Sequence, residues 1–193
     1  KKAKQAVPEA ENLEEIASGG FKVVYKALVN DKVEAVKLVE IPTDESDTSV
    51  RDENMRRIKR EVDILGKCTS PYLVRLGSIS PRLCEIDATE YVLYSEEYIP
   101  GNSLRQMILE DNRPPKSELV QLGICMIGVV RELAAMNVVH RDIKPDNIIK
   151  TDNRKRPFVL LDLGIAFQIG GTRLIRNSCQ FPDNAYHANS QLN

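Results

Sequence analysis

The segment at residues 140–147, HRDIKPDN, constrains the fold of this chain more than any other feature of the sequence. It follows a long apolar helical pattern. After it come two short apolar pieces, 148–149 and 158–161, which predict a small hairpin, and then the turn Asp162-Leu163-Gly164. Asp and Asn are common in turns, so any one of these residues alone would indicate only an ordinary polar loop. Because the charged residues, the proline and the amide follow in a fixed order after a buried helix, the segment predicts a functional loop.

The first half of the chain has patterns typical of β-strands. Segments that alternate or run apolar predict strands at 21–29, 33–39, 72–78 and 90–94. Asn30-Asp31 is typical of a hairpin turn, and residues 80–87 are expected to connect the last two strands. A polar loop is predicted at 43–49 and a charged helix at 52–67. This half is therefore expected to be a sheet with one helix.

Helices are expected to dominate after Pro100-Gly101. Ser103 is predicted to cap a short helix at 104–110, and a second, long helix is predicted at 117–136. The apolar part of the long helix, residues 119–130, is far shorter than the roughly 20 residues that a membrane span needs. We therefore expect a buried core helix and no transmembrane segment. No regular pattern is clear after Phe167.

Composition excludes several classes of protein. The chain has 193 residues, 42% of them hydrophobic, so it is long enough to bury a substantial core. Its 27 Lys+Arg and 28 Asp+Glu give a formal net charge of −1, which does not favour a nucleic-acid partner. The cysteines are too scattered for a zinc site or a redox pair and are expected to be reduced, in a cytoplasmic protein: Cys68, Cys84, Cys125 and Cys179.

The motifs HRDIKPDN and DLG together resemble the catalytic loop and the metal-binding turn of the eukaryotic-type (Hanks-type) Ser/Thr protein kinases. The resemblance implies that Asp142 receives the proton of the attacking hydroxyl. It implies that Lys144, a residue typical of the Ser/Thr kinases, contacts the transferred phosphate. Asn147 and Asp162 would hold Mg²⁺ that bridges the phosphates of ATP.

A second set of residues for the same chemistry lies in the first half of the chain. Lys37, in Ala35-Val36-Lys37, matches the strand lysine of the family, which orients the α- and β-phosphates. On the predicted helix, Glu61 shares a face with the apolar residues Ile58, Val62 and Leu65. A carboxylate on an inward face is costly unless it is paired. The resemblance implies that its partner is Lys37.

The family's glycine loop and adenine pocket are matched less closely. Ala17, Gly19 and Lys22 fall at the three glycine positions, with Gly20 as a further flexible residue, and Lys22 could reach a phosphate. In the E-Y-x-P-G-like hinge, the resemblance implies that Glu97 and Ile99 make main-chain contacts to adenine. It implies that the apolar walls of the adenine pocket come from Val24, Ala35 and Ile149. Glu96 falls at the back of this pocket, where it either has a basic partner or indicates a register shift by one residue.

The implied fold class is α+β, a bilobal kinase-like fold with a β-rich N-lobe that carries one helix and an incomplete, mainly helical C-lobe. The expected divisions are a tail at 1–12, the N-lobe at 13–97, the start of the C-lobe at 98–164, and a partial activation segment with a tail at 165–193. Only 31 residues follow Asp162, which fits a fragment, omitted residues or a naturally shortened protein. Thr172 and Ser178 are possible phosphorylation sites, although ordinary polar residues are the favoured interpretation of both.

The leading functional hypothesis is an ATP- and Mg²⁺-dependent Ser/Thr protein kinase that acts on a protein hydroxyl. The alternative is a pseudokinase-like module that binds nucleotide or serves as a scaffold without transferring phosphate, as the poor glycine loop and Glu96 suggest. A kinase of small molecules such as aminoglycosides or choline is less favoured, because those relatives usually lack the H-R-D-x-K-P-x-N form. The sequence leaves the oligomeric state open.

Overall fold

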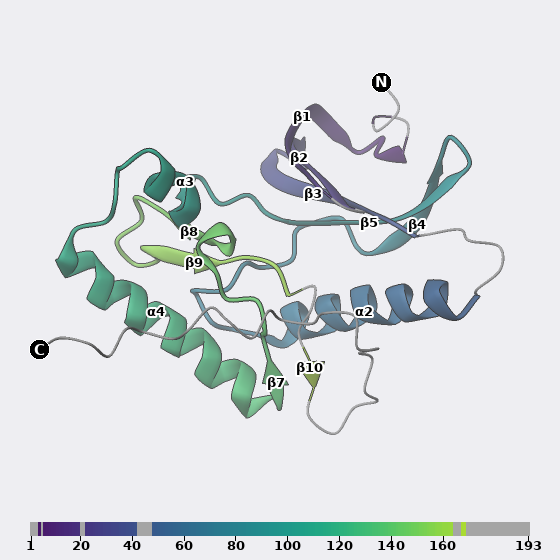
Figure 1. The fold of residues 1–193 in the computed structure, drawn as a ribbon. Helices are drawn as coiled ribbons and strands as arrows, with labels where there is room; N and C mark the ends of the chain where they lie inside the picture. The colour runs from purple at the N-terminus through teal and green to yellow at the C-terminus, as the bar shows by residue number, and fades with distance from the viewer. Residues whose placement is uncertain (1–3, 5, 20–21, 42–47, 164–166, 169–193) are drawn as a thin grey trace, which may run out of the picture.

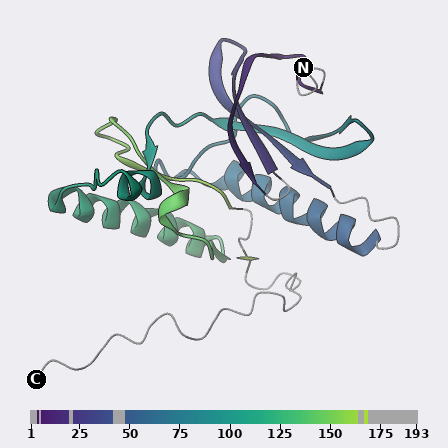
Figure 2. The ribbon, with the colours of Figure 1, turned by 45° about the horizontal axis from the view of Figure 1, so that its top comes forward.

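The computed structural model describes residues 4, 6–19, 22–41, 48–163 and 167–168. These residues form two lobes, a curved antiparallel sheet with one helix beneath it and a second lobe built around a long helix (Figure 1). In Figure 2 the helices of the second lobe lie to one side of the molecule and the N-lobe helix lies to the other. The expected bilobal α+β fold is therefore confirmed.

The N-lobe sheet has five strands in the order β1-β2-β3-β5-β4, and all neighbours are antiparallel. Its strands are β1 (Ala10–Gly19), β2 (Lys22–Val29), β3 (Lys32–Glu40), β4 (Arg82–Ile86) and β5 (Thr89–Glu97). Asn30 and Asp31 have φ values of 48° and 61°, which confirms the predicted hairpin turn between β2 and β3. Because β3 lies in the middle of the sheet, its side chains are held in fixed positions.

Both edge strands differ from the sequence-based expectation. β1 takes in the last residues of the predicted tail, and Val7 and Ala10 are fully buried beneath the sheet edge. β4 lies within residues 80–87, which were expected to be only a connection. Most β1 residues and several in β4 are exposed, so neither strand carries a clear alternating pattern. Pairing with β2 and β5 decides their conformation instead.

The strand predicted at 72–78 is wrong. This segment makes only isolated bridges, from Leu73 to Leu160 of the C-lobe and from Leu76 to Glu96 of the sheet. Its backbone bonds alternate in the same way: Val74 N–H donates to Leu160 (3.0 Å), and Arg75 carbonyl accepts from the N–H of Glu97 (2.9 Å). The apolar residues of the segment therefore join the two lobes rather than extend a sheet.

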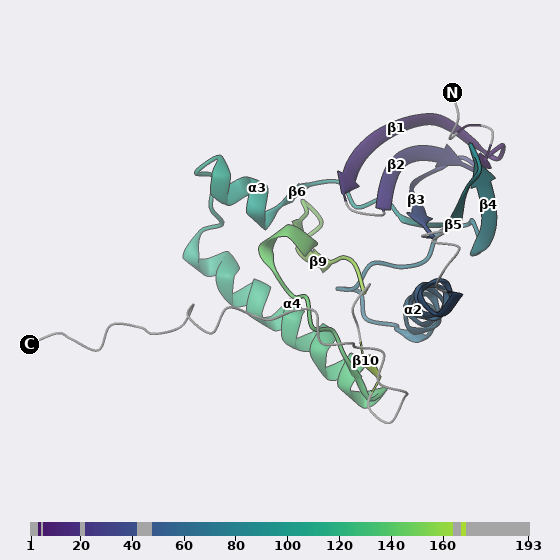
Figure 3. The same ribbon diagram turned by 45° about the vertical axis from the view of Figure 1, so that its right-hand side comes forward.

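Helix α2 (Thr48–Lys67) begins four residues before the predicted start and packs against one face of the sheet, as the end-on view in Figure 3 shows. Ile58 packs there with the buried sheet residues Val92 and Tyr94. Nearer its C-terminus, Ile64 and Leu65 belong to the core of the second lobe. One helix thus contacts both lobes, which fixes where its inward-facing side chains lie relative to the cleft.

The C-lobe follows the predicted order of elements. It contains β6 (Asn102–Ser103), α3 (Leu104–Leu109), α4 (Lys116–Ala135), β7 (Val138–Val139), a 3₁₀ turn (Pro145–Asn147), β8 (Ile148–Lys150), β9 (Phe158–Leu160) and β10 (Phe167–Gln168). Ser103 caps α3 as predicted, because its side chain accepts from Gln106 N–H at 3.1 Å. The predicted hairpin is formed by β8 and β9, and β10 adds an unforeseen pairing with β7.

Only one face of α4 is buried, so the expected buried core helix is a half-exposed one. Cys125, Val129 and Leu133 pack against Phe158 and Leu160 of the hairpin, whereas other apolar side chains of the helix are exposed. No helix in the described part of the chain is long and apolar enough to cross a membrane. Within the same residues Cys68, Cys84 and Cys125 are free thiols, and burial raises the pKa of Cys68 to about 11.

Candidate active site

A cleft of about 430 Å³ lies between the sheet and the C-lobe. That volume is in the range of small-molecule sites. Predicted site residues that line it come from β1, β2, β3, β5, the hinge and the C-lobe: Ala17, Val24, Ala35, Lys37, Glu97, Ile99, Asn147, Ile149 and Asp162. The fold thus brings together side chains that are widely separated in the sequence.

Lys37 lies deep in this cleft between two buried carboxylates. Its Nζ is 2.5 Å from Glu96 Oε1 and 3.7 Å from Glu61 Oε1. The three residues are only 5%, 2% and 6% exposed, in the order Lys37, Glu96 and Glu61. The expected contact between Lys37 and Glu61 is present, and Glu96 has the basic partner that one interpretation required. The alternative of a register shift is therefore not needed.

Sheet register explains why Glu96 reaches Lys37. Across the β3–β5 ladder Lys37 is opposite Tyr94, and Ala35 is opposite Glu96. Residues two apart on a strand share a face, so Lys37 and Glu96 are diagonal neighbours on the face that lines the cleft. The Tyr94 ring lies 5.5 Å from Lys37 Nζ and adds a cation–π contact.

The charges of this cluster are strongly coupled. Burial lowers the pKa of Lys37, but the carboxylates around it, Glu96 first, more than offset that effect and hold its pKa well above the ordinary value. Burial raises the pKa of Glu96, and Lys37 offsets only part of that rise. Lys37 is therefore a protonated cation.

The predicted catalytic loop lies beside the cleft. Asp142 Oδ2 accepts hydrogen bonds from Asn147 Nδ2 at 2.9 Å and pairs with Lys144 Nζ at 2.8 Å. Asn147 also donates to the backbone carbonyl of Asp142 at 3.0 Å. Arg141, just before Asp142, has a φ of 70°, a left-handed conformation that is uncommon for a residue with a Cβ. These contacts orient one carboxylate oxygen of Asp142 and leave the other for a further donor.

Asp162 lines the cleft together with Asn147 and also has a left-handed φ, of 61°. The N–H of Leu161 donates to the Asn147 carbonyl at 2.7 Å, and the N–H of Leu163 donates to Glu61 Oε1 at 3.3 Å. The Asp162 carboxylate forms an ion pair with the ammonium of Lys22, which reaches down from β2. The residue that replaces a loop glycine therefore contacts the predicted metal ligand.

The donor set suits a magnesium ion. The described residues contain no group of three or more His, Cys, Asp and Glu that could hold a metal. Mg²⁺, however, is commonly bound by one or two carboxylates together with substrate phosphates. Asp162 supplies one carboxylate, and Asn147 supplies an amide oxygen, because its Nδ2 is engaged by Asp142. A cation at Asp162 would have to displace or share the contact with Lys22.

The hinge is held by an arginine that sequence reasoning did not single out. Arg156 donates from Nη1 to Glu97 Oε2 at 2.8 Å and from Nη2 to Glu97 Oε1 at 2.6 Å. Arg156 Nε also donates to the carbonyl of Pro71 at 2.5 Å. Because the N–H of Glu97 bonds to Arg75, it is not free for the predicted main-chain contact to adenine, for which only the carbonyl is left.

Some predicted residues lie outside the lining of the cleft. Glu61 lies behind Lys37, while Asp142 and Lys144 reach the cleft through Asn147. Gly19 is described, and a Cβ there would meet nothing within 4 Å, so close approach does not demand glycine at this position. Gly20, Gly164, Thr172 and Ser178, which the sequence analysis named, lie outside the described residues.

Several lining residues were missed: Ile16, Tyr98, Gly101, Ser103, Gln106, Asp146 and Leu161. Tyr98 and Gly101 belong to the hinge motif, and Leu161 precedes the DLG turn, so the motifs themselves contained that signal. Gln106 had no such signal, because it reaches the cleft only through the position of α3.

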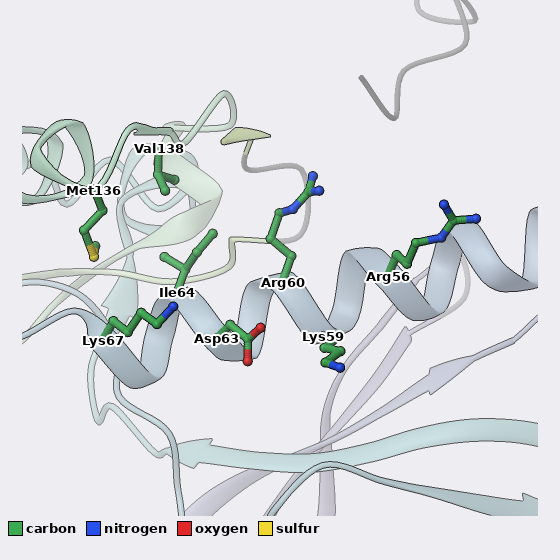
Figure 4. Close-up of a pocket in the computed structure, with 8 residues that line it drawn as sticks. All are labelled: Arg56, Lys59, Arg60, Asp63, Ile64, Lys67, Met136 and Val138. Carbon is green, nitrogen blue, oxygen red and sulfur yellow. The ribbon is translucent and has the colours of Figure 1, made fainter. Parts of the chain in front are cut away.

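A separate groove of about 350 Å³ runs between α2 and the end of α4 (Figure 4). Its lining is largely basic, with Ile64, Met136 and Val138 as the apolar part and Arg56, Lys59, Arg60, Asp63 and Lys67 as the charged part. In Figure 4 the Arg56 and Arg60 side chains point away from the sheet. The groove shares no residue with the cleft. Most of its charged side chains are exposed, so we interpret them as ordinary solvated surface charges.

The family model of the protein kinase domain matches residues 10–190. Myosin light chain kinase A of Dictyostelium discoideum is 26% identical over 183 residues, which cover 93% of this chain and 57% of that protein. Serine/threonine-protein kinase PknK of Mycobacterium tuberculosis (strain ATCC 25618 / H37Rv) is 29% identical over 164 residues, or 83% of this chain and 14% of that one. MAP kinase kinase PBS2 of Saccharomyces cerevisiae is 29% identical over 165 residues, or 82% and 22%.

Among solved structures, Rad53 in complex with AMP-PNP is similar with a TM-score of 0.64 at 22% identity. The similarity covers 84% of this chain and 42% of that one, and it shows a shared fold. The chain thus spans 57% of the length of myosin light chain kinase A and much smaller shares of the other two kinases.

Proposed function

This chain belongs to the protein kinase family, and on that premise we propose that it binds ATP with Mg²⁺ and transfers the γ-phosphate to a Ser or Thr hydroxyl of a protein. The observation that carries the proposal is the convergence of Lys37, Asn147 and Asp162 on one cleft, with Glu61 in contact with Lys37. Such a set of one cation, one amide and two carboxylates is what phosphoryl transfer requires, since the reaction depends mainly on positioning and charge stabilisation.

Each of the site residues has a distinct task in this proposal. Lys37 binds the α- and β-phosphates as a buried cation, and Glu61 limits its movement. Asp142 orients the attacking hydroxyl and accepts its proton on a carboxylate that Asn147 and Lys144 hold in place. Lys144 is 48% exposed in its side chain, so it can turn from Asp142 toward the transferred phosphate.

Asp162 and Asn147 would hold Mg²⁺, which when bound neutralises charge on the phosphates. Val24, Ala35 and Ile149 form apolar walls on either side of the space next to the hinge, which suits a flat adenine ring. The Ser/Thr class of substrate rests on Lys144 and on the names of the relatives. A cytoplasmic location remains a prediction.

The pseudokinase alternative is favoured by a specific observation. Two of the groups that would meet the nucleotide or its metal have a charged partner within the chain, Lys37 with Glu96 and Asp162 with Lys22. A protein that only binds nucleotide, or that is a scaffold, would tolerate such contacts. Against it stands the full set of Lys37, Glu61 and the loop residues, which a protein without phosphotransfer does not need.

A phosphotransfer assay with labelled ATP, Mg²⁺ and a generic basic protein separates the two functions. The purified protein should transfer label, and Asp142→Asn should reduce transfer by about a hundredfold or more while ATP binding is kept, because general acid–base catalysis contributes about 10²–10⁴. Asp152→Asn is the matched control, since Asp152 is exposed and lies outside the cleft. Equal transfer by the wild type and Asp142→Asn would overturn the proposal, and ATP binding without any transfer would favour the pseudokinase.

A further inference from the structure

Glu96 is a carboxylate that the phosphotransfer chemistry does not use. It lies in the lining of the cleft, is 2% exposed, and makes the shortest contact of Lys37, at 2.5 Å. Glu61, the partner that the family resemblance implies, is 3.7 Å away from Lys37, beyond hydrogen-bond distance. The main partner of the phosphate-binding lysine is therefore a residue of the sheet and not one of the helix.

We propose that Glu96 acts as an internal competitor of the nucleotide phosphates for Lys37, and so lowers the affinity of the cleft for triphosphate relative to the uncharged nucleoside. The inference rests on the proposed function, because it assigns Glu96 a role at the same nucleotide site. It makes Glu96 a specificity-determining residue for the charge of the ligand.

Position gives this competition its strength. Lys37 and Glu96 are diagonal neighbours on adjacent central strands, so neither backbone can move away without breaking the ladder between β3 and β5. A nucleotide phosphate that takes Lys37 leaves the Glu96 carboxylate buried without its main partner, which is costly. If Lys37 keeps both contacts, the carboxylate instead repels the phosphate at close range. Either arrangement weakens the binding of an anionic ligand.

Charge around the cleft points in the same direction. Lys37 is one ammonium between two carboxyl groups, those of Glu96 and Glu61, so this buried cluster holds more acidic than basic side chains. Asp162 faces the same space, and its pairing with Lys22 cancels its charge only locally. Adenosine has no charge to meet this cluster, whereas ATP does. The effect of Glu96 should therefore appear with ATP and be absent with adenosine.

The test compares ATP and adenosine by isothermal titration calorimetry in excess Mg²⁺. For Glu96→Gln we expect the Kd of ATP to fall on the order of tenfold, and the Kd of adenosine to change little, because only the charged partner of Lys37 is removed. Glu85→Gln is the charge-matched control, since Glu85 lies exposed on β4, and it should change neither value. Glu96→Met removes the carboxylate with an apolar side chain of similar length and should act in the same direction if the amide does not fold.

Glu61→Gln separates competition from general repulsion. If Glu96 competes for Lys37, removal of Glu61 leaves that pair intact and gives no tighter ATP binding. Equal tightening by Glu61→Gln and Glu96→Gln would overturn the inference, as would an unchanged or weaker affinity of Glu96→Gln for ATP, or an equal gain for adenosine. The wild type offers a further check, because ATP that binds more than about a hundredfold tighter than adenosine would contradict competition. No ATP binding by any variant would instead overturn the proposed function itself.

Discussion

Replacing Arg156 by Ala should loosen the hinge of the cleft by a measurable amount. The guanidinium donates to Glu97 at 2.8 and 2.6 Å and to the Pro71 carbonyl at 2.5 Å. The side chains of Arg156 and Glu97 are 19% and 26% exposed, so water screens the pair only in part. Exposed ion pairs contribute about 0.2–1 kcal/mol, and hydrogen bonds to charged groups about 1.5–3 kcal/mol. We expect Arg156→Ala to lower the free energy of unfolding by about 2–3 kcal/mol.

Urea unfolding followed by circular dichroism measures this change. Arg154→Ala is the matched control, because Arg154 lies exposed on the same loop and should change the free energy by no more than about 0.5 kcal/mol. Arg156→Lys should lose most of the contribution, since an ammonium cannot make the two parallel bonds to Glu97. The reasoning would be refuted if Arg156→Ala had the same free energy of unfolding as the Arg154→Ala control.

Two further predictions concern buried polar groups. Gly77→Ala should lower the free energy of unfolding by about 1–3 kcal/mol, because a Cβ would lie 2.5 Å from Glu34 Oε2 and against Ser95 Oγ. Gly123→Ala is the control and should not destabilise the protein, because a Cβ there meets nothing within 4 Å. Thermal unfolding of the two variants measures the difference. His140 is 4% exposed and burial lowers its pKa, so the unfolded chain binds its proton more tightly. Stability should therefore fall as pH drops below about 6.5, and His140→Gln should reduce that slope between pH 7 and pH 5; an unchanged slope would contradict a buried neutral imidazole.

The sequence predicted which residues meet around the cleft better than it predicted their detailed contacts. The spacing within residues 140–147 and the inward position of Glu61 on its helix are local properties, and the structure places these side chains where that spacing implies. The hairpin turn at Asn30-Asp31 and the cap at Ser103 were predictable for the same reason, since a few neighbouring residues determine each of them.

Strand predictions failed where pairing decides the conformation. β1 and β4 are edge strands with exposed side chains, and their hydrogen bonds come from β2 and β5. Residues 72–78 have an apolar pattern that suits a strand, yet Leu73 and Leu76 each make a single bridge to a different lobe. A side-chain pattern within one segment cannot report which distant backbone will pair with it.

Sequence alone therefore determined which residues are candidates for the chemistry and which family the chain resembles, because motif spacing and helical or strand periodicity are properties of neighbouring residues. The tertiary structure decided the partners: Glu96 rather than Glu61 as the nearest anion to Lys37, Lys22 at Asp162, and Arg156 at Glu97. Each of these contacts joins residues that are far apart in the sequence, and its existence depends on strand register and lobe packing. Charge pairing over such separations follows from the fold because only the folded chain sets the distances between the charges.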